Sequence, residues 1–378
     1  MSLLTEEQLL IKNMVREYAE KELRPIAGEI DKTETFPLES VKRMADLKLL
    51  GLTTPKEYGG QGMDYVAYSL AIEELSRVCA SHGIFLSVHI SLCSGPIQYH
   101  GTDEQKKRYL PDLAAGRKVG AFCLTEPGAG TDSAAQKTTA VKQGDKYILN
   151  GTKIFITNGS FAETFVVFAM TDPSKGLKGI SAFIVEKSFP GFKVGSPFHK
   201  MGIRGSSQTE IIFENCEVPA ANLLGKEGEG FKIAMKTLDA GRIGVGSQAL
   251  GIAQGAMEQA IEYAKERIQF GKPISANQGI QWMLADMALK VEASRLLLHN
   301  AAKLKDAGEN FSMAAAMGKL QASETAMWVT TKSVQVHGGM GFTTALPIER
   351  FMRDAKITEI YEGTSEVQRI VIAANILK

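Results

Sequence analysis

One glutamate near the end of the chain combines a residue type and a setting suited to acid–base chemistry. Glu362 stands between an aromatic residue and a glycine, and Ile357, Ile360 and Tyr361 precede it. We expect these apolar neighbours to draw the carboxylate inward, where burial would raise its pKa and let it act as a general base near neutral pH. A lone glutamate is more often a solvated loop residue, so this prediction depends on the burial.

The segments around Glu362 have to hold it in place. A glycine cluster occupies residues 335–342, and a charged segment with helical spacing occupies residues 349–356. After Thr364, apolar residues recur at the spacing of one helix face. Thr364 is therefore predicted to be the N-cap of a last helix, and Gly363 gives the preceding turn its backbone freedom.

A second polar stretch, residues 123–132, has the sequence CLTEPGAGTD. Its hydroxyls and glycine-rich backbone could bind polar ring edges or phosphate, although a stretch like this is by itself more often a simple turn. It does not follow the GxGxxG pattern of a βαβ unit, which disfavours NAD binding.

Composition limits the class of protein. The chain has 378 residues, 44% hydrophobic and 22% charged, with a formal net charge of +1. Such a neutral chain is not typical of nucleic-acid or membrane-surface binding, and no apolar run reaches the roughly 20 residues of a membrane span. Four scattered cysteines predict reduced thiols in a cytoplasmic protein. Six histidines without metal-ligand spacing predict no metal site. A capping box at residues 5–8 predicts a first helix with no signal or transit peptide before it.

The spacing of apolar residues changes from helical to strand-like and back again, which predicts an α+β protein with three domains. Residues 1–118 read as an all-α domain, residues 119–228 as an all-β barrel or sandwich, and residues 229–378 as a helical bundle. In the first domain we expect helices over 37–50, 64–76 and 103–113, and a helix break at residues 94–96. In the second we expect strands over 165–169, 180–185 and 210–213, and a hairpin turn at Asn150-Gly151.

The third domain should contain three long helices, over residues 231–269, 276–304 and 311–336. The first of them contains several glycines, each of which costs roughly 1 kcal/mol relative to alanine inside a helix. We expect most of these glycines to allow close helix packing, while Gly241 leaves room for a ligand.

Taken in order, these motifs resemble the acyl-CoA dehydrogenase family along essentially the whole chain. The order is residues 123–132, then FITNG at 155–159, RxxFG at 267–271, QxxGGxG at 335–341 and YEGT at 361–364. The likeness is greatest to short-chain, butyryl-type members, through residues 201–207, 237–244 and 247–254.

The resemblance implies FAD between the β domain and the C-terminal bundle. Thr125 and Thr157 would bind the flavin ring, with Phe155 packed beside it where many relatives have tryptophan, and Arg267 of a neighbouring subunit would hold the pyrophosphate. The implied cofactor residues are Phe122, Leu124, Thr125, Gly130, Thr131, Phe155, Ile156, Thr157, Arg267, Gln269, Phe270, Gln278, Gln335, Val336, Gly338, Gly339, Thr364 and Glu366.

The resemblance also implies the reaction, the α,β-dehydrogenation of an acyl-CoA thioester. Glu362 would remove the α-proton while a β-hydride goes to flavin N5; relatives that place the base on the earlier helix do so at the position of Gly241, where glycine cannot serve. The implied substrate residues are Thr131, Leu238, Asp239, Arg242, Tyr361, Glu362 and Gly363. Asp239 and Arg242 also have the spacing of a simple helical ion pair.

The implied partners are the acyl-CoA substrate, electron-transferring flavoprotein as electron acceptor and further copies of the chain in a homotetramer, with no nucleic acid and no membrane. Leu92, Cys93 and Ser94 are expected to set a pocket for about four to six carbons. The alternatives are a short branched-chain substrate, a flavin oxidase and an inactive scaffold of the same fold.

Overall fold

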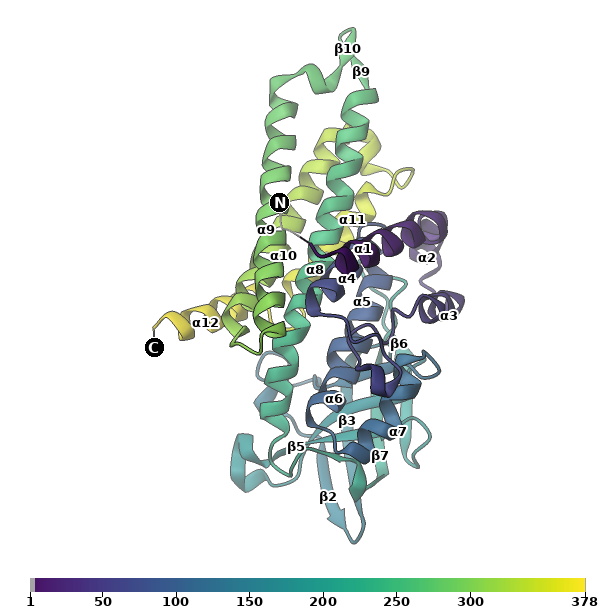
Figure 1. Cartoon of the computed structure of the whole chain (residues 1–378), viewed down its shortest axis with the longest axis vertical. Coiled ribbons are helices and arrows are strands. Elements are labelled where there is room, and N and C mark those ends of the chain that lie inside the picture. Colours follow the sequence, from purple (N-terminus) through teal and green to yellow (C-terminus); the bar gives the residue numbers. More distant parts are fainter. Residues whose placement is uncertain (1–3, 378) are drawn as a thin grey trace.

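The computed structural model describes residues 4–377, which form helices, then a sheet, then helices again (Figure 1). The first part includes two π-helical segments, η1 and η3, which interrupt longer helical paths. Its elements are α1 (Glu6–Tyr18), η1 (Ala19–Leu23), α2 (Ala27–Thr33), α3 (Leu38–Asp46), α4 (Tyr65–Ser76), α5 (Ala80–Ser87), η3 (Val88–Ser94), α6 (Gly95–His100) and α7 (Asp103–Ala114).

Local sequence signals predicted some of these boundaries and missed others. Thr5 and Gln8 form the expected capping box of α1, and all of α4 is buried, as a continuous apolar helix should be. The helix expected over 37–50 is too long, because α3 ends at Asp46 and Lys48 turns to a φ of 60°. The expected break at 94–96 is wrong, since Pro96 lies in the first turn of α6, where a missing N–H needs no partner.

The middle part is one eight-stranded sheet in the order β6-β7-β3-β2-β4-β5-β8, with β1 paired to β4. β4 and β5 are buried along almost their whole length, which matches their continuous apolar sequence. The strands are β1 (Gly120–Cys123), β2 (Thr139–Gln143), β3 (Lys146–Thr157), β4 (Thr164–Met170), β5 (Ile180–Glu186), β6 (Phe192–Pro197), β7 (Gln208–Pro219) and β8 (Leu223–Leu224).

The hairpin turn expected at Asn150-Gly151 is wrong, because β3 runs through both residues. The pairing of β3 with β7 shifts register between Leu149 and Gly151, which makes an irregularity in the strand. A Cβ on Gly151 would lie 2.4 Å from the Thr138 hydroxyl. Glycine is needed there for a close approach of neighbouring chain, and not for a turn.

The last part is a bundle of long helices that carries a small two-stranded hairpin at its far end (Figure 1). The three predicted long helices are confirmed, with small shifts at their ends. We propose residues 118 and 228 as the ends of the first two domains, next to the starts of β1 and α8. The elements are α8 (Gly230–Glu266), β9 (Ile268–Gln269), β10 (Lys272–Pro273), α9 (Gln278–Asp306), α10 (Ser312–His337), α11 (Ile348–Lys356) and α12 (Ser365–Ile376).

Glycines let α8 pack closely against its neighbours. A Cβ on Gly246 would lie 2.4 Å from the Leu298 side chain on α9, and one on Gly251 would lie 2.3 Å from the Glu73 carbonyl oxygen on α4. Real Cβ atoms do not approach other atoms so closely, so these positions admit no side chain without movement. The predicted packing role of most glycines in this helix is confirmed.

Buried polar groups join the sheet to the helices. The side-chain amide of Asn158 donates to the carbonyl oxygens of Phe85 on α5 and Gly120 on β1, at 3.2 and 3.1 Å. Nδ1 of His89 accepts from the Gly120 N–H, while its Nε2 lies 3.1 Å from the Leu113 carbonyl oxygen. Burial lowers the pKa of His89 to about 4, so this imidazole is a neutral structural linker.

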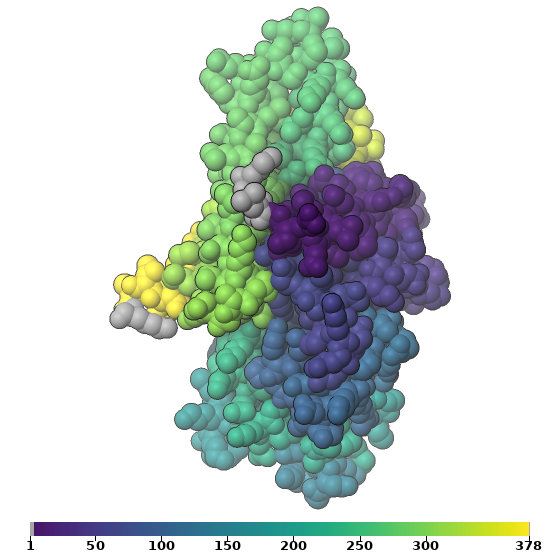
Figure 2. Space-filling model, in the orientation of Figure 1, coloured from purple at the N-terminus to yellow at the C-terminus, as the bar shows by residue number. Residues whose placement is uncertain are grey.

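The two ends of the C-terminal part stand away from the body of the molecule. The space-filling view shows the tip of the β9–β10 hairpin at one end and α12 projecting from the side (Figure 2). Both carry exposed apolar side chains, such as Phe270 at the tip and Ile370 on α12. Within residues 4–377, no helix has the length and hydropathy needed to cross a membrane.

We expect Gly251→Ala to destabilise the protein by about 1–3 kcal/mol, because the added methyl overlaps the backbone of α4. Gly279→Ala is the matched control: it lies in α9 with open space around it, so the higher helix propensity of alanine should leave stability unchanged or slightly raised. Urea unfolding of both variants measures the difference, and equal midpoints would contradict the packing role of Gly251.

Candidate active site

The Glu362 carboxylate lies against α8 at Gly241, which has no side chain. A Cβ on Gly241 would lie 1.9 Å from Glu362 Oε2 and 2.8 Å from the Leu92 side chain. The room expected at Gly241 therefore exists, and the Glu362 carboxylate itself occupies part of it. Oε2 is shielded from solvent and has no hydrogen-bond partner among residues 4–377, so one face of the carboxylate is free to take a proton.

The turn that carries Glu362 is strained and is held from several sides. Glu362 has a φ of 52° and Gly363 a φ of 93°, both left-handed. Tyr361 donates its hydroxyl hydrogen to Gln248 on α8, and Gln368 donates to the Gly363 carbonyl oxygen at 2.8 Å. Thr364 caps α12 as predicted. A non-glycine residue stays left-handed only when its surroundings enforce it, as they do here.

The burial of the carboxylate has only in part the origin that the sequence suggested, because Ile357 and Tyr361 pack half-buried in the same apolar cluster as Leu92. Ile360 is about half exposed and does not cover Glu362. Instead α8, Leu92 of η3 and α10 enclose it. Burial raises the pKa of Glu362 to about 7, against the opposing charges of Lys319 and Arg242.

Lys319 on α10 belongs to this site, and sequence reasoning missed it. Its side chain is 0% exposed, and its ammonium donates to the Gly363 carbonyl oxygen at 2.8 Å. The position looked like an ordinary polar residue on a long helix; the only available signal was a lysine beside Gly318 in an alanine-rich, tightly packed stretch.

A buried ion pair shapes the 123–132 stretch, which was also not predicted. Lys153 of β3 is 0% exposed and donates to Glu126 Oε1 at 2.7 Å and to the Leu124 carbonyl oxygen at 3.2 Å. The Ile154 N–H donates to the Thr125 carbonyl oxygen at 2.9 Å. Burial would raise the pKa of Glu126, but Lys153 and the Lys137 N–H hold it below its ordinary value. These contacts bring Thr125 next to the end of β3.

The end of β3 has features that fit a planar ring. Phe155 is 58% exposed with a φ of 56°, which turns its ring out of the sheet and onto Phe198 at 5.0 Å between centroids. Two residues on, the Thr157 hydroxyl accepts from Gln208 at 3.2 Å. Gly130 has open space where a side chain would stand. An exposed aromatic, nearby hydroxyls and an open glycine-rich loop fit the flavin that the resemblance implies.

The other predicted residues of this region have different surroundings. Phe122 packs edge-on against Phe168, and Thr131 is exposed on the loop. The side chain of Ile156 is buried in the core, so only its backbone is available to a ligand.

The remaining predicted cofactor residues, other than Thr364 and Glu366 beside the Glu362 turn, lie at the opposite end of the molecule. Arg267, Gln269, Phe270 and Gln278 are exposed at the β9–β10 hairpin, Phe270 being 99% exposed (Figure 1). The stretch from Gln335 to Gly339 lies near this hairpin, because the ring of His337 stacks on that of Tyr263 near the end of α8, with 4.4 Å between centroids. In this stretch the Val336 side chain is buried, whereas Gln335, Gly338 and Gly339 are exposed.

One chain therefore does not bring all predicted cofactor residues together. Arg267 caps α8, whereas Gly241 stands 26 residues earlier in that helix, which is about 39 Å along its axis at 1.5 Å per residue. The hairpin cannot share a dinucleotide with the Glu362 turn of its own chain.

Most predicted substrate residues lie on the N-terminal half of α8 or in the Glu362 turn, whereas Thr131 lies on the 123–132 loop. Asp239 accepts from Arg242 at 2.5 Å and from the Ser312 hydroxyl at 2.9 Å, so the predicted helical ion pair is present. Leu238 of the same helix is half-buried and packs against the apolar cluster that contains Leu124 and Val166. Glu366 is exposed in the first turn of α12.

The expected role of Cys93 in the acyl pocket is wrong. Its thiol donates towards the Thr164 carbonyl oxygen at 3.6 Å, and its Cβ would lie 2.5 Å from a Cβ on Gly120, so it faces the sheet. Leu92, one residue earlier, points towards Glu362.

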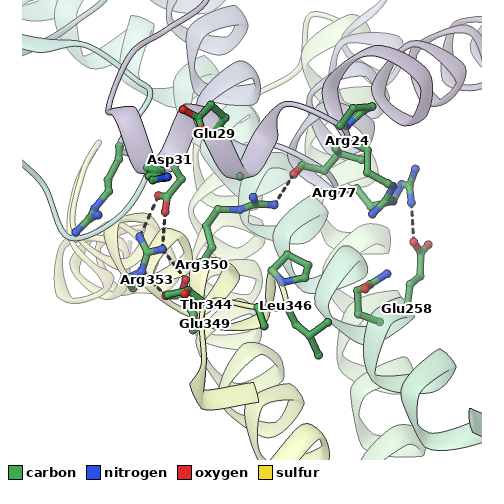
Figure 3. A pocket seen from close by; sticks show the side chains of 18 of the residues that line it. Arg24, Glu29, Asp31, Arg77, Glu258, Thr344, Leu346, Glu349, Arg350 and Arg353 are labelled. Carbon is green, nitrogen blue, oxygen red and sulfur yellow. Dashed lines mark hydrogen bonds and ion pairs between the residues drawn. The ribbon is translucent and has the colours of Figure 1, made fainter. Parts of the chain in front are cut away.

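A groove on the surface lies away from these predicted site residues. A groove of about 1120 Å³ lies between α2, α8 and α11, where Arg353 pairs with Asp31 and Glu349 and Arg77 pairs with Glu258 (Figure 3). None of the predicted site residues, all of them described, lines it. Its charges largely neutralise one another. Within the described residues there is also no group of three or more His, Cys, Asp or Glu able to hold a metal.

Comparisons with known proteins agree with this geometry. Models of the N-terminal, middle and C-terminal domains of acyl-CoA dehydrogenases match residues 5–117, 121–216 and 228–377. The short-chain specific acyl-CoA dehydrogenase of Clostridium acetobutylicum is 58% identical over 99% of both chains.

Two solved structures cover the whole chain and are themselves wholly covered. Butyryl-CoA dehydrogenase from Megasphaera elsdenii is 48% identical with a TM-score of 0.98. A chain from work on the electron transferring flavoprotein of Acidaminococcus fermentans and flavin-based electron bifurcation is 57% identical with a TM-score of 0.99.

We expect Lys153→Met to destabilise the protein by about 3–5 kcal/mol, because it leaves the buried Glu126 carboxylate without its cation. Adding Glu126→Gln should recover a large part of that loss. Urea unfolding of Lys153→Met, Glu126→Gln and the double variant at pH 7.5 measures this. A double variant as unstable as the sum of the single variants would show that the two groups do not act as a pair.

Proposed function

The chain belongs to the acyl-CoA dehydrogenase family, and we propose that it dehydrogenates short-chain acyl-CoA thioesters to trans-2-enoyl-CoA with Glu362 as the base. One observation carries the proposal: a carboxylate with a pKa of about 7 and an unpartnered Oε2 faces the space that Gly241 leaves open. A base with this pKa is half ionised near neutral pH and can both take and release a proton.

The residues around Glu362 bind and orient the substrate. A thioester makes its α-hydrogen weakly acidic, and Glu362 Oε2 accepts that proton as the double bond forms. Arg242, Asp239, Leu238 and Thr131 contact the acyl-CoA. Leu92 and α8 exclude water from the carboxylate, which keeps the reacting atoms together in a dry site.

We propose FAD as the cofactor; when bound, it supplies the acceptor for the β-hydride. Thr125, Thr157 and Phe155 would hold the ring, and Thr364 and Glu366 would lie beside it. Leu124, Gly130 and the backbone of Ile156 complete this half of the site.

The other half of the cofactor site comes from a second chain. Arg267, Gln269, Phe270, Gln278 and the stretch from Gln335 to Gly339 would hold the distal part of FAD for a neighbour, because they lie about 39 Å from Gly241 of their own chain. Exposed apolar residues at the tip and on α12, Phe270 and Ile370 among them, support burial between copies. We propose a homotetramer built as a dimer of such dimers.

Electrons would leave through electron-transferring flavoprotein, which the relative from Acidaminococcus fermentans supports. The Clostridium and Megasphaera relatives support a short acyl chain. A short branched chain remains the alternative substrate, since one methylene is worth only about 1–3 kcal/mol of discrimination. We propose a cytoplasmic location, which four free, buried cysteines support because thiols persist in reducing compartments.

We expect Glu362→Gln to retain FAD and bind butyryl-CoA but to lose flavin bleaching by at least a thousandfold, because an amide cannot take the proton. In the unchanged enzyme the single-turnover rate should rise with pH, with a midpoint near 7, since only the ionised carboxylate accepts a proton. Stopped-flow absorbance from pH 5.5 to 9 measures both. Bleaching by the variant at the unchanged rate would rule out Glu362 as the base.

Arg267→Ala should lower the FAD content and the oligomeric state together, because the guanidinium would hold the pyrophosphate of a neighbouring chain. Lys303→Ala, exposed on α9, is the control for loss of a surface charge. Absorbance at 450 nm and light scattering on a sizing column give the two readouts. Full flavin occupancy in Arg267→Ala would contradict the shared site.

Turnover should peak with butyryl- or hexanoyl-CoA and fall steeply by octanoyl-CoA, because a tail that cannot be seated displaces the thioester from Glu362. A shift on the order of 1 Å can cost about a hundredfold in rate. A panel of C4 to C12, isobutyryl and isovaleryl thioesters under single-turnover conditions tests this. A maximum at C8 or longer would remove the short-chain assignment and leave the role of Glu362 intact.

A further inference from the structure

Lys319 is a buried cation with no function assigned to it so far. Its side chain is 0% exposed, and its one hydrogen bond within residues 4–377 goes to the Gly363 carbonyl oxygen at 2.8 Å. Burying an ammonium is costly unless opposite charge or dipoles compensate it. An apolar side chain of the same length would fill this space without the cost of burying a charge. The charge of Lys319 therefore needs an explanation.

Close helix packing places this lysine at the catalytic turn. A Cβ on Gly246 of α8 would lie 3.3 Å from the Cα of Lys319, and Gly318 packs against Leu298 of α9. The two glycines let α10 approach α8 and α9 closely, and the Lys319 side chain then reaches across to the Gly363 carbonyl. The lysine is thus fixed by three helices, and not by flexible loops.

The carbonyl that Lys319 contacts belongs to the strained part of the turn. Gly363 O accepts from both Lys319 Nζ and Gln368 Nε2, each at 2.8 Å. The two bonds fix the peptide between Gly363 and Thr364, and Gln368 also donates to the Glu362 carbonyl oxygen at 3.3 Å. Together these bonds hold Glu362 and Gly363 in their left-handed conformation, with φ values of 52° and 93°. This conformation directs the Glu362 side chain at Gly241.

Charged groups reach Glu362 from each element packed against it. Lys319 on α10 and Arg242 on α8 favour its ionised form, and Arg242 is already paired with Asp239. Tyr68 on α4 and Tyr361 in the same loop stay neutral, because burial raises the pKa of each phenol. Lys319 is therefore the cation near Glu362 that has no carboxylate partner of its own in the described ion pairs. Glu359 and Glu366 raise the pKa of Lys319 by less than Glu362 does.

We propose that Lys319 is a positioning residue, which locks the Gly363 carbonyl and thereby aims the Glu362 carboxylate and stabilises its negative charge. The proposal rests on Glu362 being the base. It adds Lys319, from the N-terminal third of α10, to the active site as a residue that acts through Glu362.

The first test is the pH profile of flavin bleaching by butyryl-CoA in Lys319→Met. Removing a nearby opposite charge raises a carboxyl pKa by about one unit or more, so the midpoint should move from near 7 to about 8 or above. The rate at pH 7 should fall about fivefold for a one-unit shift and recover at pH 9. Lys319→Arg, which keeps the charge, should keep the midpoint even if the rate falls.

Lys332→Met is the matched control, because it removes a lysine from the same helix 13 residues away, about 20 Å along the axis. Its profile should equal that of the unchanged enzyme. A rate that falls equally at all pH values in Lys319→Met, with an unmoved midpoint, would reduce Lys319 to a packing role and overturn the proposal.

The second test needs no substrate and uses thermal unfolding of the FAD-loaded protein. We expect Lys319→Met to lower the melting temperature at pH 7.5 when Glu362 is present, but much less when Glu362 is replaced by Gln, because only an ionised Glu362 loses a partner. At pH 5.5, where Glu362 is protonated, Lys319→Met should have the same effect in both backgrounds. Melting-temperature changes that add at both pH values would overturn the proposal.

The two tests separate this proposal from the proposed function. If no acyl-CoA bleaches the unchanged enzyme, the proposed function fails, and the thermal comparison still decides whether Lys319 and Glu362 interact. If butyryl-CoA bleaches the unchanged enzyme and Lys319→Met behaves like Lys332→Met, the function stands and the Lys319 proposal fails.

Discussion

The contact between a carboxylate and a helix that has no side chain at the contact point organises this structure. Glu362 Oε2 occupies the space where a Cβ on Gly241 would stand, so any other residue at 241 would push the carboxylate away. The same contact removes the carboxylate from water, which raises its pKa to about 7. Position and proton affinity thus have one physical cause. The left-handed turn, the Tyr361–Gln248 hydrogen bond and the Lys319 ammonium all serve to keep that contact in place.

The length of α8 has the second large consequence. Its N-terminal half faces the Glu362 turn, and its C-terminal end carries Arg267 and the exposed hairpin. A rigid helix cannot fold back on itself, so the two ends act at different places. A dinucleotide site that needs both can only be completed by two chains. The exposed apolar residues at the tip and on α12 are then the surfaces of an assembly rather than unusual features of a monomer.

Two of the buried charged side chains lie beneath the functional loops. Lys153 pairs with Glu126 beneath the 123–132 loop, and Lys319 binds the Gly363 carbonyl beneath the catalytic turn. A buried ion pair adds little net stability compared with apolar packing, but it fixes one geometry, because every alternative leaves a charge unpaired. Both lysines hold loops that regular secondary structure does not hold, which explains why charge and not packing was used there.

The sequence by itself determined the order of helices and sheet, the long C-terminal helices, the caps at Thr5 and Thr364, and the identity of the candidate base. These follow from local periodicity, side-chain capping and a motif order that spans the chain.

The sequence did not determine the course of β3 through Asn150-Gly151, the end of α3 or the continuation into α6, because the close approach of Thr138 and the packing around η3 override local turn signals. Only the tertiary structure decided that Gly241 makes room for Glu362 itself, that Cys93 faces the sheet, and that Lys153 and Lys319 are buried beneath the two functional loops. Each of these depends on which residues from distant segments come into contact, and the residues next to it in the sequence do not indicate those contacts.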